Sequence, residues 1–430
     1  MRTSRRKTAI AAAAATCLLL APPVQAAVLA NPAPTDPAPT SSPAPEAAPG
    51  ERDTYTVPGT DVAQRTEITR TGAQVLAERG GTATVEATGA QAEQLRGKGL
   101  VLQHRENVGQ VLDRIRPAGE PGDFPPDDRG YHTYDETNAE LDAAVRDHPG
   151  TAAKTSIGKT FEGRDIPAVK ISDNADRDED EPEVLFDCNQ HAREHLTTEM
   201  CLRIVNRFTD GTDDPAIRDM VDNHEIWVVP MVNVDGSVHD VATGQYQGWR
   251  KNRQGPGTDL NRNWGHEWAC CGGSSDDPQD ETYHGTGPFS APATDALKRF
   301  VDSRVVDGRQ QIKTNIDFHT YSELVMWPFG YTQDQVTDGM TREEYDRFAR
   351  VGTEIADTNG YTPQQSSGLY ITDGDILDWE WARHKILGFT LEMYPKEGGI
   401  DGFYPPDEVI ERETARNDAA VDRIIRESDA

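Results

Sequence analysis

The spacing of the apolar residues changes sharply near the middle of the chain. A continuous apolar run over residues 184–186 is typical of a buried strand. The pattern predicts that a helix follows, with His191 and Glu194 on the turn between strand and helix. In open α/β folds, ligands bind beyond the carboxyl ends of strands, so this turn is a candidate site. The apolar residues that share one face of the predicted helix are Leu196, Met200, Ile204, Val205 and Phe208.

Three further apolar runs predict buried strands, over residues 226–232, 312–318 and 386–391. Strand and helix patterns alternate from about residue 123 to residue 430, which predicts one α/β domain. His319 follows the second run and Glu392 follows the third. A single histidine in such a place is more often part of the core. A histidine and a glutamate at the ends of two strands together favour a functional site.

Residues 54–106 show a second, smaller alternation. The pattern predicts strands over residues 55–57, 82–87 and 100–103, and helices over residues 64–79 and 90–95. This α+β unit contains no catalytic constellation.

A stretch rich in proline and glycine follows at residues 116–126, where Arg114 and Arg116 offer cleavage points to a protease. We interpret residues 54–122 as an inhibitory pro-domain and residues 123–430 as the catalytic domain. A permanent accessory domain is the alternative interpretation.

The N-terminus has the features of an export signal. Basic residues at positions 2, 5, 6 and 7 precede an apolar run over residues 9–21, and the small residue Ala26 offers a cleavage point. This apolar run is too short to span a bilayer, and no later segment is long and apolar enough to do so. We expect a signal peptide over residues 1–26, a proline- and alanine-rich linker over residues 27–53, and a secreted, extracellular protein. The Arg5-Arg6 pair leaves a twin-arginine route open beside the general one.

The amino-acid composition restricts the possible binding partners but says little about the reaction. The 430 residues include 73 acidic and 43 basic side chains, and this net charge of −30 argues against nucleic acid as a partner. Cys17 lies in the signal peptide. The other four cysteines could form two disulfides in any of three pairings, and the adjacent pair could close on itself only with strain. We expect a structural use for these four: Cys188, Cys201, Cys270 and Cys271.

Two kinds of metal site are compatible with the stretch His191-Ala-Arg-Glu194-His195. As His-x-x-Glu it offers one histidine and one carboxylate, a weak motif when it stands alone. As His-x-x-Glu-His it matches the inverted zinc protease signature, in which both histidines bind the metal and the glutamate is the base. That signature must lie wholly on a helix. Because a predicted strand ends at residue 186, the first interpretation is favoured.

The motifs along the rest of the chain resemble, in their order, those of the zinc carboxypeptidase family. The likeness is greatest to the bacterial carboxypeptidase T enzymes and spans about residues 131–417, while the N-terminal region resembles that family's prosegment. It implies a mixed, twisted β-sheet flanked by helices, preceded by a small α+β pro-domain. The motifs are Trp249-Arg-Lys-Asn-Arg253, Asp259-Leu-Asn261-Arg262, Asp317-Phe-His319, Leu369-Tyr370, Asp378-Trp379 and Thr390-Leu-Glu392.

The resemblance implies a catalytic zinc ion held by His191, Glu194 and His319. Three protein ligands and one water are what a catalytic zinc site requires. Glu392 is then the general base that takes a proton from this water and passes it to the leaving amine.

The resemblance also implies the residues that surround the reacting bond. Arg253 stabilises the oxyanion, and Asp259 orients the first zinc histidine. Asn261, Arg262 and Tyr370 bind the free C-terminal carboxylate of the substrate. Because an internal peptide bond has no such charge, this clamp implies an exopeptidase.

The implied protein is a secreted, zinc-dependent metallocarboxypeptidase that is made as a zymogen. Its substrates are the C-termini of peptides and proteins, its partner is an activating protease, and it acts as a monomer without nucleic acid or membrane. An inactive binding or transport module with the same fold is the alternative from another class. The presence of Glu392 together with all three ligands favours the enzyme.

Leu377 and Asp375, which both precede the Asp378-Trp379 motif, bear on which C-terminal residue of the substrate is removed. Leu377 implies hydrophobic and aromatic side chains, while Asp375 resembles the acid that lets carboxypeptidase T accept basic ones as well. We therefore expect dual specificity, with Arg and Lys cleaved more weakly. Alternatively, Asp375 only caps the following helix.

Residues 172–183 hold seven acidic residues and one arginine in twelve positions. Clustered hard oxygens bind Ca²⁺ well, and the resemblance favours a structural calcium site here. A solvated acidic turn is the equally open alternative.

Overall fold

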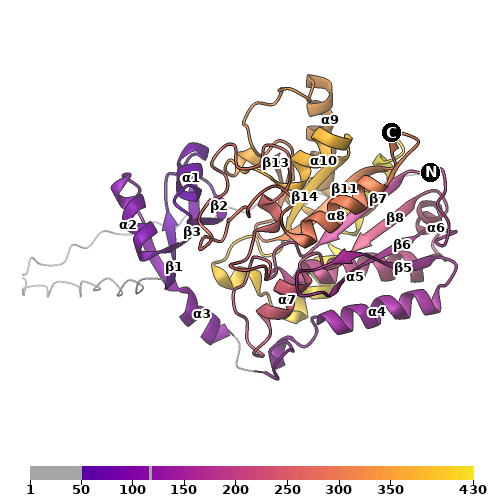
Figure 1. The fold of residues 1–430 in the computed structure, drawn as a ribbon, viewed down its shortest axis with the longest axis horizontal. Helices are drawn as coiled ribbons and strands as arrows, with labels where there is room; N and C mark the ends of the chain where they lie inside the picture. The colour runs from indigo at the N-terminus through magenta and orange to yellow at the C-terminus, as the bar shows by residue number, and fades with distance from the viewer. Residues whose placement is uncertain (1–50, 116–118) are drawn as a thin grey trace, which may run out of the picture. The chain divides into compact units, whose positions relative to one another are not determined.

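The computed structural model describes residues 51–115 and 119–430 as an N-terminal lobe and a larger C-terminal lobe (Figure 1). The predicted signal peptide, and the predicted linker up to residue 50, lie outside the described residues. Within the described ranges, no helix is both long and apolar enough to cross a membrane.

The N-terminal lobe is a four-stranded antiparallel sheet with strand order β2-β3-β1-β4. Helices α1 and α2 pack on it, and α3 leads towards the C-terminal lobe. Its elements are β1 (Arg52–Val57), α1 (Val62–Thr69), β2 (Gln74–Arg79), β3 (Thr82–Thr88), α2 (Gly89–Gly97), β4 (Gln103–Asn107) and α3 (Val108–Ile115).

Two sequence predictions for this lobe were wrong in detail, and one helix was not predicted. The helix expected over residues 64–79 ends at Thr69, the chain turns at Gly72 with φ of 81°, and residues 74–79 form strand β2. The apolar run within β2 fits either period, and pairing with β3 decides its structure. The last strand lies three residues later than predicted, and helix α3 was not predicted.

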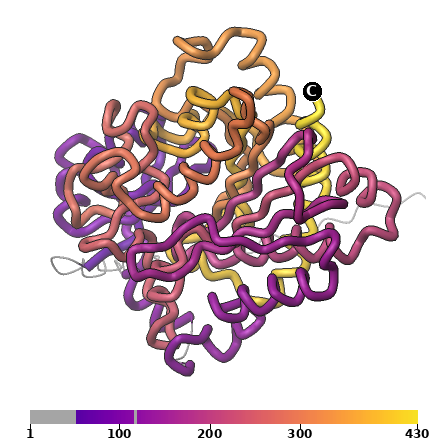
Figure 2. The backbone as a smooth tube through the Cα atoms, turned by 45° about the vertical axis from the view of Figure 1, so that its right-hand side comes forward, coloured from indigo at the N-terminus to yellow at the C-terminus, as the bar shows by residue number. Residues whose placement is uncertain are grey.

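The C-terminal lobe is built on an eight-stranded mixed sheet with strand order β13-β12-β14-β11-β7-β8-β6-β5, which confirms the predicted fold class. The central strands β14, β11, β7 and β8 run parallel, and β6 and β12 pair antiparallel at either side. Figure 2 shows how segments from distant parts of the chain lie side by side in it. The strands are β5 (Ala152–Lys159), β6 (Asp165–Ile171), β7 (Glu183–Cys188), β8 (Glu225–Val229), β11 (Ile312–Thr320), β12 (Leu324–Trp327), β13 (Thr362–Gln365) and β14 (Leu387–Met393).

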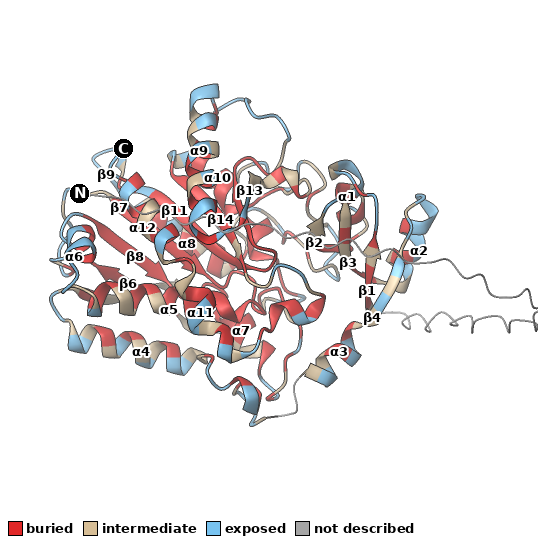
Figure 3. Cartoon of the chain, turned by 180° about the vertical axis from the view of Figure 1, so that it is seen from behind, coloured by how far each residue is buried: buried red, intermediate tan, exposed pale blue. Residues whose placement is uncertain are grey.

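Helices cover both faces of this sheet because its central strands are apolar on both sides. Val184 and Phe186 of β7 pack into one core, while Leu185 packs into the other. Figure 3 shows the central strands buried and one side of α4 exposed. The first core includes α4 (Tyr134–Asp147), α5 (His195–Asp210), α6 (Pro215–Val221), α9 (Arg342–Asn359) and α12 (Asp418–Glu427). The second includes α7 (Val234–Asp240), α8 (Pro292–Ser303) and α10 (Ile376–His384).

The four cysteines form two disulfides, Cys188–Cys201 and Cys270–Cys271. The first joins the end of β7 to α5, so it closes the base of the turn that carries His191 and Glu194. The structural use expected from the sequence is therefore what the structure shows.

Candidate metal centre and active site

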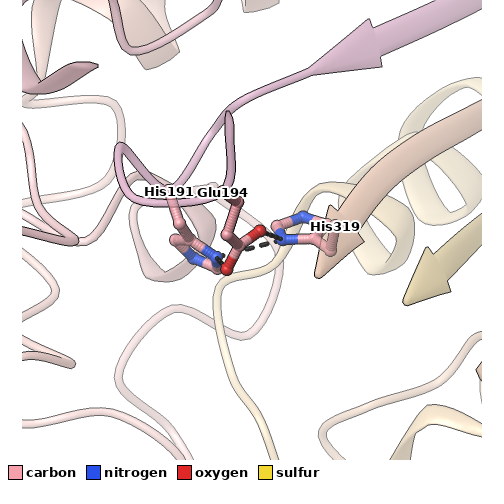
Figure 4. A group of neighbouring side chains, drawn as sticks. All are labelled: His191, Glu194 and His319. Carbon is pink, nitrogen blue, oxygen red and sulfur yellow. Dashed lines mark hydrogen bonds and ion pairs between the residues drawn. The ribbon is translucent and has the colours of Figure 1, made fainter. Parts of the chain in front are cut away.

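Three side chains converge at the carboxyl edge of the central strands (Figure 4). His191 and Glu194 lie on the turn after β7, and His319 lies near the end of β11. The turn is shaped by Asn189, which has a φ of 58° and whose side-chain amide donates to the carbonyl oxygens of His191 and Ala192 at 3.3 Å. A short polar side chain suits this left-handed conformation. The local sequence thus points both residues towards the neighbouring strand.

The geometry of the three side chains is that of a metal site. Glu194 Oε1 lies 2.9 Å from His191 Nδ1, and its Oε2 lies 2.9 Å from His319 Nδ1. The two Nδ1 atoms face each other at 3.0 Å, where both cannot donate a hydrogen bond. All three residues are buried. A cation held between the two Nδ1 atoms and the Glu194 carboxylate would satisfy all three side chains. Two histidines and one carboxylate are a donor set that suits zinc.

The outer nitrogens of both rings are already bonded to carboxylates. His191 Nε2 lies 3.1 Å from Asp259 Oδ1, and His319 Nε2 lies 2.8 Å from Asp317 Oδ2. These bonds leave the Nδ1 atoms to face the centre. Burial alone would raise the pKa of Glu194, but the two histidines lower it below its ordinary value.

His195 does not join this group. It begins helix α5, and its Nε2 lies 2.9 Å from Asp240 Oδ2. Its ring packs against Phe124 and Tyr246. The geometry therefore disfavours the inverted zinc signature.

Glu392 lies beside the group, because β14 pairs with β11 in a register that places Glu392 next to His319. Burial, helped by the nearby Glu194, raises the pKa of Glu392 to about 8 against the opposing effect of His319. Its Oε2 atom has no protein hydrogen-bond partner in the described chain. A carboxylate with a raised pKa and a free oxygen suits proton transfer.

The arginine that lines the cavity is Arg250, whereas the sequence analysis assigned the oxyanion role to Arg253. Arg250 lines the cavity with the three converging residues, and its guanidinium donates to Asp259 Oδ2 at 2.9 and 3.1 Å. Arg253 instead stacks on Trp249, 4.6 Å from the ring centre, and does not line the cavity. The stretch is irregular, so residue spacing could not show which arginine points inwards.

The comparisons with known proteins agree with this geometry. The sequence profile described as zinc carboxypeptidase matches residues 137–420. The chain is 45% identical over 393 residues to a zinc carboxypeptidase of Saccharothrix mutabilis subsp. capreolus, covering 88% of this chain and 89% of the relative. The chain belongs to the zinc carboxypeptidase family.

Other relatives extend the likeness beyond bacteria. Mouse carboxypeptidase A1 is 31% identical over 287 residues, which covers 64% of this chain and 65% of the relative. The crystal structure of carboxypeptidase A from Helicoverpa armigera has the same fold, with a TM-score of 0.72 at 22% identity over 89% of this chain and 98% of that one. Membership implies a catalytic Zn²⁺ ion and activity as a zinc metallocarboxypeptidase on peptide C-termini.

In this carboxypeptidase a cavity opens over His191, Glu194 and His319. It is lined by all but two of the site residues predicted from the sequence: Arg253 lies outside it, and the buried Asp259 lies behind His191. Arg193, which the sequence analysis did not assign, also lines it and is fully buried.

The three residues predicted to bind the substrate carboxylate differ in their freedom. Arg262 Nη2 lies 3.4 Å from the hydroxyl of Tyr370, so these two meet across the cavity. Asn261 is held on both sides: its Oδ1 accepts from the backbone of Ile376 at 3.0 Å, and its Nδ2 lies 3.4 Å from Asp317. Arg262 is held as well, because its Nε donates to the carbonyl oxygen of Gly273 at 3.2 Å and its Nη1 to that of Asn261 at 2.5 Å. Asn261 and Arg262 are both buried, whereas Tyr370 is partly exposed and is the least constrained of the three.

Asp375 both caps a helix and faces the cavity. Its Oδ1 accepts from the backbone of Asp378 at 2.9 Å, which caps α10, and its Oδ2 accepts from the hydroxyl of Thr372 at 2.7 Å. Burial raises the pKa of Asp375. Leu377 lines the same cavity. The capping alternative is thus correct as geometry, but it does not remove the carboxylate from the pocket.

The N-terminal lobe supplies part of the cavity wall, through Thr69 at the end of α1 and Gln74, Val75 and Leu76 of β2. Arg65 of this lobe donates to the carbonyl oxygens of Leu369 and Gly368 at 2.5 and 3.0 Å. These carbonyls directly precede Tyr370. The lobe therefore holds the loop that carries one of the substrate-binding candidates.

Proposed function

We propose that this zinc carboxypeptidase is made as a secreted zymogen and that, once activated, it removes hydrophobic, aromatic and, more weakly, basic C-terminal residues. The observation that carries the proposal is the convergence of His191, Glu194 and His319 within a cavity that Glu392 and Arg262 also line. This places a metal site, a proton acceptor and a fixed positive charge in one enclosure.

The zinc ligands are His191, Glu194 and His319. A zinc ion held there would act as a Lewis acid that activates water and polarises the substrate carbonyl. Glu392 accepts a proton from the attacking water and delivers it to the leaving amine, a role that its raised pKa and unpartnered oxygen support. Arg250, rather than Arg253, supplies the positive charge beside the developing oxyanion.

Asn261, Arg262 and Tyr370, which line the cavity together, bind the free C-terminal carboxylate. An arginine offers a carboxylate two parallel hydrogen bonds, which gives direction as well as charge. Asp375 and Leu377 face the C-terminal side chain of the substrate. An acid beside an apolar wall supports acceptance of both apolar and basic side chains.

The N-terminal lobe is the inhibitory pro-domain. Its support is that it walls the cavity and, through Arg65, fixes the loop before Tyr370. Gln74 of the lobe also accepts a hydrogen bond from Arg193 at 2.9 Å inside the cavity. Cleavage in residues 116–126 by an activating protease would let the lobe leave. The N-terminal sequence pattern supports secretion.

The acidic loop at residues 172–183 holds a structural calcium ion. Oxygen atoms of Asp173, Glu179 and Glu181 lie within 4.8 Å of one another. The more deeply buried acids nearby are already paired, Glu183 with Arg304 at 2.6 Å and Glu225 with Lys170 at 2.5 Å. The carboxylates of Asp173, Glu179 and Glu181 offer the hard oxygen ligands that Ca²⁺ prefers.

One experiment tests the main proposal. Intact and protease-activated enzyme are given blocked dipeptides that end in Phe, Leu, Arg or Lys, and the corresponding C-terminal amides, with and without a chelator. We expect hydrolysis of the free acids only, much faster after the lobe is removed, and abolished by the chelator. Equal rates on amides would contradict the carboxylate clamp. Equal rates before and after removal of the lobe would show a permanent accessory domain.

A further inference from the structure

His319 is bonded on its outer side to a buried carboxylate that is not among the predicted site residues. Asp317 lies two positions earlier on β11, so both side chains emerge on the same face of the sheet. Asp317 Oδ2 is 2.8 Å from His319 Nε2, and Asp317 is fully buried. The side-chain amide of Asn261 also approaches the same oxygen, at 3.4 Å.

The two histidines of the metal group have carboxylates in different surroundings. Asp259, behind His191, shares its charge with Arg250, whose guanidinium donates two hydrogen bonds to Asp259 Oδ2. Asp317, behind His319, forms no ion pair with any lysine or arginine of residues 51–115 and 119–430. Its hydrogen bond to the ring of His319 is therefore the main interaction that its charge makes.

A second carboxyl group lies beside Asp317. Asp187 of β7 is its partner in the parallel register, and it is also fully buried. Burial raises the pKa of Asp187 well above its ordinary value, and Asp317 raises it further. Asn315 donates to Asp187 Oδ1 at 3.0 Å and to Glu380 at 3.1 Å. These contacts fix the strand positions from which Asp317 reaches His319.

We propose that Asp317 is a positioning residue of the zinc site: it accepts the Nε2 proton of His319 and thereby turns Nδ1 towards Glu194 and His191. This inference rests on the proposed ligand set. An imidazole has one proton, so a strong acceptor at Nε2 leaves the lone pair on Nδ1 for the metal. Loss of such an outer carboxylate typically costs about 10–100-fold in metal affinity.

The test measures zinc affinity rather than turnover, by competition between the purified protein and a chromophoric chelator. Asp317→Asn keeps the size of the side chain but removes its charge, and we expect its zinc affinity to fall by about 10–100-fold. Asp240→Asn is the matched control. Asp240 is also buried and also lies 2.9 Å from a histidine Nε2, but that histidine, His195, is outside the metal group. Its zinc affinity should stay within about threefold of the unaltered protein.

His319→Ala separates the two levels of the argument. If it loses zinc while Asp317→Asn binds zinc as well as the unaltered protein does, the positioning role is wrong and the ligand set stands. If His319→Ala retains stoichiometric zinc, the ligand set itself is wrong. Should Asp317→Asn fail to fold, Asp317→Ser also removes the carboxylate and is expected to weaken zinc binding in the same way. Unchanged affinity in Asp317→Ser would then overturn the proposal.

Discussion

Carboxylates gather in two regions of this carboxypeptidase, the metal cavity and the acidic loop at residues 172–183. At the cavity, Glu194 in its wall and Asp259 behind that wall are buried and have fixed partners: two histidines for the first, His191 and Arg250 for the second. In the loop, Asp173 is exposed and Glu179 and Glu181 are partly so. The comparison teaches that acid content alone does not mark a site, since the loop is the richer in acids. Burial together with a defined partner distinguishes the cavity.

Two acids at the edge of the loop are also buried, and their partners show what role they have. Glu183 and Glu225 are fully buried, and each lies close to a cation, Arg304 or Lys170. Their role is to hold β7 and β8 together with the neighbouring chain, because a buried charge without a partner would be costly. Partners of opposite sign make these acids structural. Two histidines that face one another make Glu194 a candidate metal ligand instead.

The largest expected effect comes from removing the ligands of the cavity. His191→Ala, Glu194→Ala and His319→Ala should each lose zinc and reduce kcat/KM by more than roughly a thousandfold, because the metal supplies most of the activation of water. His195→Ala should keep zinc, since His195 is bonded to Asp240. Zinc content by mass spectrometry checks both statements. Zinc retained by the His319 variant, or lost by the His195 variant, would restore the inverted signature.

The next largest effect is the expected difference in kcat between variants of Arg250 and of Arg253, which lie in one motif. Arg250→Ala should lower kcat by roughly 100–1,000-fold, the usual cost of losing an oxyanion partner. Arg253→Ala is the matched control, and it should change kcat less than about threefold because Arg253 lies outside the cavity. Steady-state kinetics on one blocked dipeptide is sufficient. The reverse order of effects would support the original assignment of Arg253.

The sequence predicted the metal group well because its signal is local. The three ligands follow predicted strands, and strand ends in a parallel sheet meet at one edge, which is where the structure has them. Asp317 could have been found in the same way, since residues two apart on a strand share a face. The distance between the Asp317 carboxylate and the His319 ring could not be predicted from the sequence.

Other features depended on tertiary structure. Arg250 and Arg253 lie in an irregular loop without periodicity, so only the folded chain shows which one faces the cavity. Strand β2 was predicted as helix because its apolar residues fit both periods, and pairing with β3 decided between them. The contact of Arg65 with the loop before Tyr370 joins residues about 300 positions apart, which no local pattern reports.

Asp375 tests whether a carboxylate can have both a structural and a functional role. Asp375→Asn should lower kcat/KM for substrates ending in Arg or Lys by at least about tenfold, since losing one partner of a buried charge pair costs roughly 2–5 kcal/mol. Substrates ending in Phe or Leu should be nearly unaffected. Asparagine is also a favoured cap, so α10 and the unfolding temperature should be preserved. If both substrate classes fall together, Asp375 is structural only.

The smallest expected effect concerns the acidic loop. Burial, together with the negative charges of Glu179 and Asp173, raises the pKa of Glu181 to about 7. The folded state therefore keeps a proton on Glu181 that the unfolded state releases near its ordinary pKa. Without calcium, the stabilisation from this protonated form is present at low pH and is lost as the pH rises through about 7.

Calcium should reverse this trend, because it binds the charged carboxylates that otherwise repel one another. Millimolar calcium should raise the unfolding temperature more at about pH 8 than at about pH 6, since below about 7 a proton competes for Glu181. Each kcal/mol gained corresponds to roughly 2–4 °C for a chain of this kind. Glu181→Gln should reduce both the calcium shift and its pH dependence, whereas Glu183→Gln, at an acid already paired with Arg304, should leave the pH dependence in place. An unfolding temperature that calcium changes at neither pH would make the loop a solvated turn, and carboxylates without fixed partners would then have no metal-binding role here.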